Sequence, residues 1–230
     1  ERELIAKIEE LTGQTGEGLL QGIGDDCAVL EKNADMVWLL TMDSLIESVH
    51  FNRAWQPPEL LGRKAAAVNF SDIAAMGGRP LFVLLALGLP ADFAPAWAEQ
   101  FLQGLAQACR EQCCLLVGGD TVRSPAGIHL TLTVLGEMRQ EQVLYRHAAQ
   151  PGQTIWVSGP LGWSAAGLAL LRAGKTMAEP QWRQLIAAHL EPQPRIELGR
   201  LLAASGLVQA MMDMSDGLAA DLGHICEQSK

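Results

Sequence analysis

Residues 57–90 read PPELLGRKAAAVNFSDIAAMGGRPLFVLLALGLP. Proline suits the first turn of a helix and glycine suits its end, so we predict a helix from Pro58 to Met76 that stops at Gly77-Gly78. The apolar run Leu81–Leu89 is bounded by two prolines and has the length and composition of a buried strand. A helix followed at once by a strand is therefore the local pattern at the centre of this sequence.

The segments on either side of this stretch alternate between the same two patterns. Glu3–Leu11 predicts a short amphipathic helix, and the apolar run Met36–Thr41 predicts a strand that stops at Asp43. Further helices are predicted over Pro95–Cys113, Ser164–Ala173, Pro180–Leu190, Pro194–Ser205 and from Ser215, and further strands over Leu115–Val117, Ile128–Gly136, Thr154–Ser158 and Leu207–Met212. Strands alternating with helices predict an α/β or α+β protein.

A boundary is predicted inside the chain after the alternating strand Ile128–Gly136. The segment Met138–Gln153 is polar and contains Pro151-Gly152, which is typical of a linker or a domain edge. We therefore expect a first domain over residues 1–137 and a second over residues 138–230.

The composition excludes several classes of protein. There are 17 Lys and Arg against 26 Asp and Glu, for a net charge of −9, and no basic run, which argues against general nucleic-acid binding. The longest apolar runs, such as Pro80–Pro90, are far shorter than the roughly 18–20 residues of a membrane span. We expect no signal peptide, because no basic segment followed by an apolar stretch opens the sequence. Five Cys without regular spacing favour a reducing compartment, so we expect a cytoplasmic protein.

Aspartates carry the chemical information in this sequence. They follow predicted strands or lie beside glycine-rich loops at Asp25-Asp26, Asp43, Asp120 and Asp213, while Asp72 lies inside the central helix and Asp216 opens the last one. Because the ends of buried strands meet at one edge of a sheet, such carboxylates can converge. Several carboxylates at one point repel each other unless cations neutralise them, and oxygen-only ligands suit Mg²⁺ bound to substrate phosphates.

Any one of these residues also has an ordinary structural explanation. A lone Asp beside Gly is by default a turn former or a helix cap, and Gly118-Gly119 could be a turn rather than a phosphate-binding loop. Taken alone, His50 fits a core or surface histidine, and Arg146 fits a solvated linker residue. Asp72 is harder to dismiss, because aspartate is unfavourable inside a helix and its apolar neighbours look buried.

Five motifs, in this order, make the chain resemble a known family. They are GIGDDCAVL (Gly22–Leu30), TMDSLIESVHF (Thr41–Phe51), AVNFSDIAAMGGRP (Ala67–Pro80), LVGGDT (Leu116–Thr121) and MDMSDGLAADLGHI (Met212–Ile225). Together they resemble the thiamine-monophosphate kinases, in the ATP-binding superfamily of aminoimidazole ribonucleotide synthetase. The Asp-Ser-Leu-x-x-x-x-His-Phe block favours this family over its relatives.

The resemblance implies ATP-dependent transfer of a phosphoryl group to thiamine monophosphate, assisted by several Mg²⁺ ions. It implies metal contacts from Asp26, Thr41, Met42 (through its main chain), Asp43, Asp72, Asp120, Asp213 and Asp216. It implies nucleotide contacts from Asp26, Gly119, Asp120, Arg146 and Ser215. His50 matches the position that touches the thiamine phosphate substrate, and no protein nucleophile is implied.

The resemblance also implies the architecture. The family fold has an N-terminal mixed sheet with helices on one side, which pairs with the same sheet of a second subunit in a homodimer, and a second α+β domain. Family members continue beyond the end of this chain, so we expect a C-terminally truncated chain with an incomplete second domain. Met42 stands where the family often has Thr, and RHAAQPGQ (Arg146–Gln153) differs from the usual pattern.

Two alternatives stay open at this point. One is another ATP-dependent enzyme of the superfamily, of the selenophosphate or aminoimidazole ribonucleotide synthetase type. No Cys precedes Gly22, which disfavours the selenophosphate type. The other is a catalytically incomplete fragment that binds a nucleotide and metal.

Overall fold

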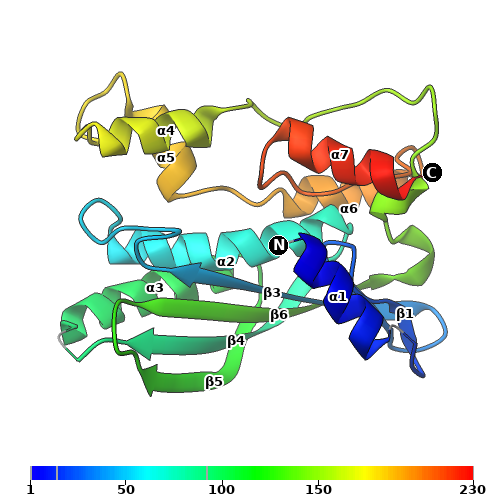
Figure 1. Cartoon of the computed structure of the whole chain (residues 1–230), viewed down its shortest axis with the longest axis horizontal. Coiled ribbons are helices and arrows are strands. Elements are labelled where there is room, and N and C mark those ends of the chain that lie inside the picture. The colour runs from blue at the N-terminus through cyan, green and yellow to red at the C-terminus, as the bar shows by residue number, and fades with distance from the viewer. Residues whose placement is uncertain (1, 14, 92, 230) are drawn as a thin grey trace.

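A six-stranded mixed sheet carries helices α2 (Pro58–Ala75) and α3 (Pro95–Glu111) on one face (Figure 1). This is a computed structural model, and it describes residues 2–13, 15–91 and 93–229. The strands are β1 (Leu19–Gln21), β2 (Ala28–Glu31), β3 (Met36–Ile46), β4 (Arg79–Leu89), β5 (Leu115–Arg123) and β6 (His129–Arg139). Their order is β1-β2-β3-β6-β4-β5, and of these neighbouring pairs β4–β5 alone is parallel. The predicted mixed sheet with helices on one side is confirmed.

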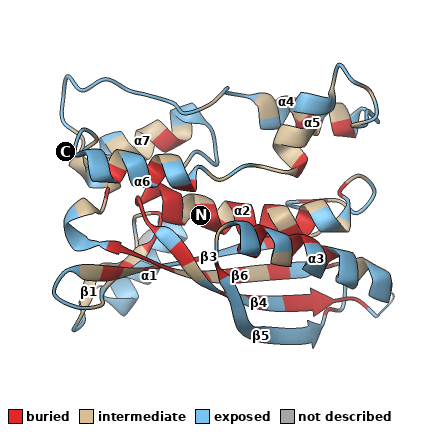
Figure 2. Ribbon diagram, turned by 180° about the vertical axis from the view of Figure 1, so that it is seen from behind, coloured by how far each residue is buried: buried red, intermediate tan, exposed pale blue. Residues whose placement is uncertain are grey.

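Alternation along β6 explains why the sheet has a helix-covered face and an open face. Leu130, Leu132 and Val134 are buried under the helices, whereas the residues between them are only partly covered. In Figure 2 the buried residues gather between the sheet and α2, and β5 is exposed along its whole length at the edge of the sheet. The main core therefore lies between the sheet and the helices, while Leu171, Ile186 and Leu190 form a second, smaller cluster.

Two glycines let α2 and α3 approach closely. A Cβ atom on Gly62 would lie 2.1 Å from the Phe101 carbonyl oxygen, and one on Gly104 would lie 1.9 Å from the Glu59 carbonyl oxygen. Neither position can hold a larger residue unless the helices separate. This contact fixes α2, which carries Asp72, against the rest of the first half of the chain.

The second half of the chain is helical. After the short turns η1 (Gln140–Gln142) and η2 (Arg146–Ala148) come α4 (Trp163–Arg172), α5 (Arg183–Leu190), α6 (Ile196–Ser205) and α7 (Leu218–Gln228). Helix α6 packs on the end of α2, where a Cβ on Gly199 would lie 2.2 Å from the Ala74 carbonyl oxygen. The buried amide of Gln56 donates to the Leu190 carbonyl at 3.1 Å and ties α5 to the segment before α2. Helix α1 (Arg2–Thr12) lies at the other end of the chain and has an exposed surface (Figure 1).

Four predicted strands need correction. β3 does not stop at Asp43 but continues to Ile46, because β6 pairs with it throughout. β5 is not broken by Gly118-Gly119, because its pairing with β4 continues past these glycines to Arg123. Thr154–Ser158 and Leu207–Met212 are not strands, because within the described part of the chain no neighbouring strand pairs with them.

The helices agree better with prediction. The expected helices all occur, although α5, α6 and α7 begin two to three residues later than predicted. Within the described residues, every helix is too short or too polar to cross a membrane.

Candidate functional site

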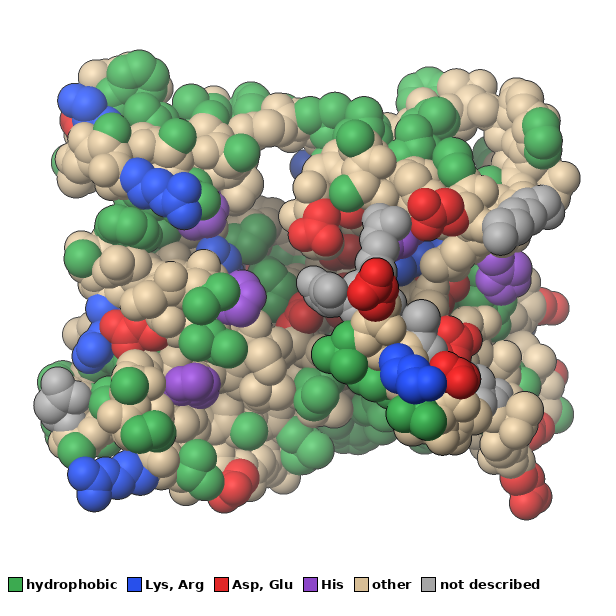
Figure 3. Space-filling view, viewed as in Figure 1, with side chains coloured by type: hydrophobic (Ala, Val, Ile, Leu, Met, Phe, Trp, Pro, Cys, Tyr) green, Lys and Arg blue, Asp and Glu red, His purple; other side chains and the backbone are tan. Residues whose placement is uncertain are grey.

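Three aspartates from distant parts of the sequence meet beside α2. Asp26 lies just before β2, Asp72 lies in the last turns of α2, and Asp213 lies in the extended segment before α7. One carboxylate oxygen from each residue lies within 4.8 Å of the others. In Figure 3 acidic side chains gather near the middle of the visible face, where the surface is hollowed between the sheet layer and the upper helices.

Burial makes this cluster costly to ionise. Desolvation, with the charges of Asp213, Asp43 and Asp26, raises the pKa of Asp72 to about 8. Desolvation also raises the pKa of Asp26 to about 7, although the Arg146 guanidinium opposes the shift. Burial raises the pKa of Asp213 as well, against a hydrogen bond from Ser71. Such raised pKa values indicate that positive charge is needed for full ionisation.

Arg146 supplies one positive charge to this cluster. Its Nη2 donates to Asp26 Oδ1, and its Nε lies 3.7 Å from Asp25 Oδ1. Asp25 is thereby explained as an anchor, because its carboxylate accepts the backbone N–H groups of Asp26 at 2.9 Å and Arg146 at 3.1 Å. Asp26 Oδ2 is buried and has no hydrogen-bond partner among the described residues. A buried carboxylate oxygen without a hydrogen-bond partner is suited to bind a cation.

Thr41 joins the cluster directly, since its Oγ1 donates to Asp72 Oδ2 at 2.5 Å. Asp43 lies on the neighbouring part of β3, and its backbone N–H donates to Asn69 Oδ1 at 3.0 Å. Asn69 is fully buried and also donates to the Ala65 carbonyl at 3.1 Å, so its amide is held rigidly. β3 and α2 are thus joined by two polar contacts next to the acidic cluster.

Other residues expected at the site lie outside the three-aspartate group. Asp120 is exposed on β5, where its carboxylate accepts the N–H of Thr121 at 2.8 Å. Gly119, with φ +154, lets β5 approach β4, because a Cβ there would lie 1.8 Å from the Leu85 carbonyl oxygen. Ser215 and Asp216 are exposed in the loop before α7, and the Met42 side chain is 65% exposed on the open face of the sheet. Their roles stay predictions.

His50 lies on a turn that follows β3. Its Nδ1 accepts the Ile46 N–H at 3.0 Å, and the ring is exposed. Burial raises the pKa of Asp43, and the nearby His50 opposes this shift, so the imidazole lies within electrostatic reach of the acidic side of the sheet. This arrangement is compatible with the expected substrate contact.

Sequence reasoning missed Asn69 and Ser71 as supports of the site. Both lie in the motif that contains Asp72, and polar residues inside an alanine-rich helix were a usable signal. Asn69 and Asp72 are three residues apart and so share a helix face.

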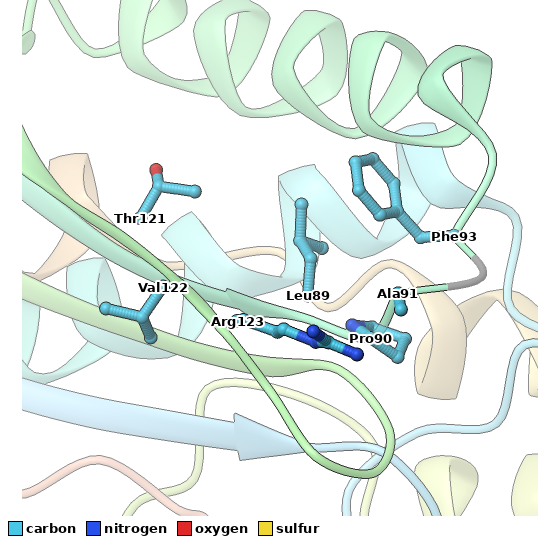
Figure 4. Close-up of a pocket in the computed structure, with 7 residues that line it drawn as sticks. All are labelled: Leu89, Pro90, Ala91, Phe93, Thr121, Val122 and Arg123. Atoms are coloured by element: carbon cyan, nitrogen blue, oxygen red, sulfur yellow. The ribbon is translucent and has the colours of Figure 1, made fainter.

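A separate hollow lies at the ends of β4 and β5. It is lined by Leu89, Pro90, Ala91, Phe93, Thr121, Val122 and Arg123 (Figure 4). Its lining is mostly apolar and includes none of the clustered aspartates. It is therefore distinct from the acidic site.

The chain matches two domain models of one family. Residues 24–138 match the AIR synthase related protein, N-terminal domain, and residues 150–230 match the AIR synthase related protein, C-terminal domain.

Individual relatives are similar over most of this chain. A thiamine-monophosphate kinase from Synechococcus elongatus is 42% identical over 90% of this chain and 64% of its own length. One from Salmonella typhimurium is 39% identical over 98% of this chain and 68% of its own length. The solved structure of AaThiL complexed with AMPPCP and TMP matches with a TM-score of 0.90 and 38% identity, over 100% of this chain and 70% of that one. The chain thus spans less than two thirds of the Synechococcus relative.

Proposed function

Because the chain belongs to the thiamine-monophosphate kinase family of AIR synthase related proteins, we propose that it transfers the γ-phosphoryl group of ATP to the phosphate of thiamine monophosphate. The observation that carries this proposal is the convergence of Asp26, Asp72 and Asp213. A similar structure, AaThiL, is complexed with AMPPCP and TMP, the two ligands that such a reaction would bring together. The products would be thiamine diphosphate and ADP.

The donor set fits Mg²⁺. Asp26, Asp72 and Asp213 offer carboxylate oxygens at short mutual distances, and Asp26 Oδ2 has no other partner among the residues described. We propose that Thr41, Asp43, Asp120, Asp216 and the main chain of Met42 complete the contacts for several ions. Bound Mg²⁺ would neutralise phosphate charge and align the two substrates.

Transfer between two phosphates needs positioning and charge neutralisation more than covalent chemistry from the protein. An oxygen of the acceptor phosphate attacks the γ-phosphorus, and the bond from that phosphorus to the bridging oxygen of ADP breaks. No side chain has to act as nucleophile. The protein's task is to hold two anionic groups in line beside its own carboxylates.

Arg146 is proposed as the nucleotide-phosphate contact. Its guanidinium already lies at the acidic cluster, bonded to Asp26. Cations held by the carboxylates would leave the guanidinium available to phosphate oxygens, which it can bind with two N–H groups. Asp26, Gly119, Asp120 and Ser215 are proposed to complete the ATP site, and His50 to contact thiamine monophosphate.

The architecture supports three further parts of the proposal. All six strands lie at or before Arg139 and α4–α7 lie after it, which supports a nucleotide- and metal-binding domain over residues 1–137 and a second domain over residues 138–230. The open face of the sheet exposes Met42 at 65% and Leu84 at 46%, and β5 is exposed along its length at the edge, which supports a homodimer formed through the sheets. All five cysteines are free, which supports a cytoplasmic protein.

The proposal is tested with γ-³²P-labelled ATP, thiamine monophosphate and Mg²⁺. Label is expected in thiamine diphosphate, in an amount equal to the ADP formed. Equal ADP formation with and without thiamine monophosphate would contradict the proposal. Mg²⁺-dependent nucleotide binding without any transfer would instead support the binding-module alternative.

A further inference from the structure

Lys64 is buried in α2, yet it has no role in the site as described so far. It is 8% exposed, and its Nζ donates to the His50 carbonyl oxygen at 3.4 Å. Within the described part of the chain it forms no ion pair with a carboxylate. A buried ammonium group without a counter-charge is costly, and lysine is almost never fully buried unless it is paired. Burial lowers the pKa of Lys64 to about 8.

The Lys64 ammonium contacts the turn that presents His50. In this turn the His50 N–H donates to the Ile46 carbonyl at 2.9 Å, and the Ile46 N–H donates to His50 Nδ1 at 3.0 Å. Because Nδ1 accepts a hydrogen bond, the hydrogen of the neutral ring lies on Nε2. The exposed ring therefore offers an N–H donor, which suits an anionic ligand. Lys64 adds the bond that ties this turn to α2.

The charge of Lys64 also affects His189 in α5. The pKa of His189 is lowered to about 4 by burial and by the positive charges of Lys64 and Arg172. Figure 3 shows histidine and basic side chains beneath α4 and α5, on the same face as the acidic group but to its left. Basic side chains thus lie on the same face as the acidic group in a protein whose net charge is −9.

We propose that Lys64 is a positioning residue for the acceptor phosphate. It holds the His50 turn through the His50 carbonyl and adds a positive charge to this turn, so that a phosphate monoester contacts the His50 Nε2–H. This inference rests on the proposed function. The missing counter-charge is then provided by the substrate when it binds.

The preceding residue offers a matched control. Arg63 donates to both carboxylate oxygens of Glu111 at 2.9 Å and to Glu191 at 2.6 Å. It joins α2 to α3 and to the end of α5, and these hydrogen bonds do not involve the His50 turn. Arg63→Gln should lower the melting temperature without changing substrate affinity.

The first test compares Lys64→Gln, Lys64→Arg and Arg63→Gln in the natural full-length chain. Lys64→Gln should raise the KM for thiamine monophosphate about tenfold or more, with the KM for ATP unchanged within about twofold, and Lys64→Arg should restore part of the loss. An active Lys64→Gln variant with an unchanged KM for thiamine monophosphate would overturn the proposal. An inactive wild-type protein would instead count against the proposed function.

The second test needs no activity. Diethyl pyrocarbonate modifies the unprotonated ring nitrogen, which in His50 is the hydrogen-bonded Nδ1. Loosening the turn by Lys64→Gln should raise the modification rate of His50 several-fold relative to exposed His129 in the same chain. Arg63→Gln should leave this ratio unchanged. An unchanged ratio in Lys64→Gln would overturn the positioning role, whether or not the enzyme is active.

Discussion

Asp72 is the residue whose chemistry departs most from its local structure. Aspartate is a poor helix former, and burial raises the pKa of Asp72 to about 8. Neither property stabilises α2. This combination supports our proposal that the Asp72 carboxylate binds a cation.

Replacing Asp72 by Asn should separate activity from stability. Asp72→Asn removes one ligand charge, so we expect kcat to fall by about three orders of magnitude or more, while the melting temperature stays the same or rises because carboxylate repulsion is relieved. Steady-state kinetics and thermal unfolding measure the two effects. Asp35→Asn, at an exposed turn, is the control and should change neither. Wild-type turnover in Asp72→Asn would contradict the metal-site account.

The raised pKa values of Asp26 and Asp72 predict a pH dependence of stability in the metal-free protein. A carboxyl group whose folded pKa is above the unfolded value of 3.8 keeps its proton in the folded state while the unfolded chain has lost it. The contribution of these two carboxyl groups to the free energy of unfolding is therefore full below the unfolded value of 3.8. It is lost as pH rises from there through the folded values of about 7 and about 8. The perturbed pKa of His189 affects stability between pH of about 4 and 6.5, and that of Lys64 affects it above pH of about 8. Between pH 6.5 and 8, the change in stability therefore reports mainly on Asp26 and Asp72.

Urea unfolding across that window should show the metal-free protein losing about 1–3 kcal/mol of stability as pH rises. Asp72→Asn should lose less, because Asn does not titrate. Mg²⁺ should stabilise the wild type more at pH 8 than at pH 6.5, since it binds the ionised carboxylates. Parallel pH profiles of the wild type and Asp72→Asn would show that Asp72 is not perturbed.

Helices α2 and α3 depend on small residues where their backbones approach. Gly104→Ala would place a methyl group 1.9 Å from the Glu59 carbonyl oxygen, and we expect a loss of about 1–3 kcal/mol or more in the free energy of unfolding. Gly223 in α7 has no atom within 4 Å of its Cβ position, so Gly223→Ala should stabilise the protein by up to about 1 kcal/mol. Denaturant titrations measure both, and equal effects of the two substitutions would refute the packing argument.

Local patterns predicted most elements because their causes are local. Proline at its start and glycine at its end predicted α2, and the alternation of apolar and polar residues predicted β6. The failures have a different cause. β1 is short and lies in a glycine-rich segment, and β3 and β5 continue past polar or glycine residues because a neighbouring strand pairs with them. Thr154–Ser158 has a strand-like composition, but no neighbour among the described residues satisfies its backbone.

The sequence predicted that aspartates would converge at a site, but it predicted only in part which aspartates would meet. Placement beside glycines and strand ends identified Asp26 and Asp213, and unfavourable helix propensity identified Asp72. Which aspartates meet is decided by the packing of α6 on α2 and the path of the following segment. The pairing of Arg146 with Asp26 joins residues 120 positions apart, and the residue pattern alone does not predict such a contact.

The molecule as a whole leaves one face of its sheet uncovered. Leu84 is 46% exposed at the middle of β4, and β5 is exposed along its length. If two copies pair through this face, Leu84→Glu should give a monomer, because a charge would be buried in the interface. Leu201→Glu, at an exposed position on α6, should leave the oligomeric state unchanged. Sedimentation equilibrium distinguishes the outcomes, and a monomeric wild type would contradict the homodimer.

The central claim is that Asp26, Asp72 and Asp213 jointly hold the divalent cation that serves phosphoryl transfer. The most direct measurement is anomalous scattering from crystals of the protein grown with Mn²⁺ and a non-hydrolysable ATP analogue. We predict an anomalous peak within coordination distance of all three carboxylates, next to the terminal phosphate of the analogue. A bound analogue without any Mn²⁺ peak between these carboxylates would contradict the claim.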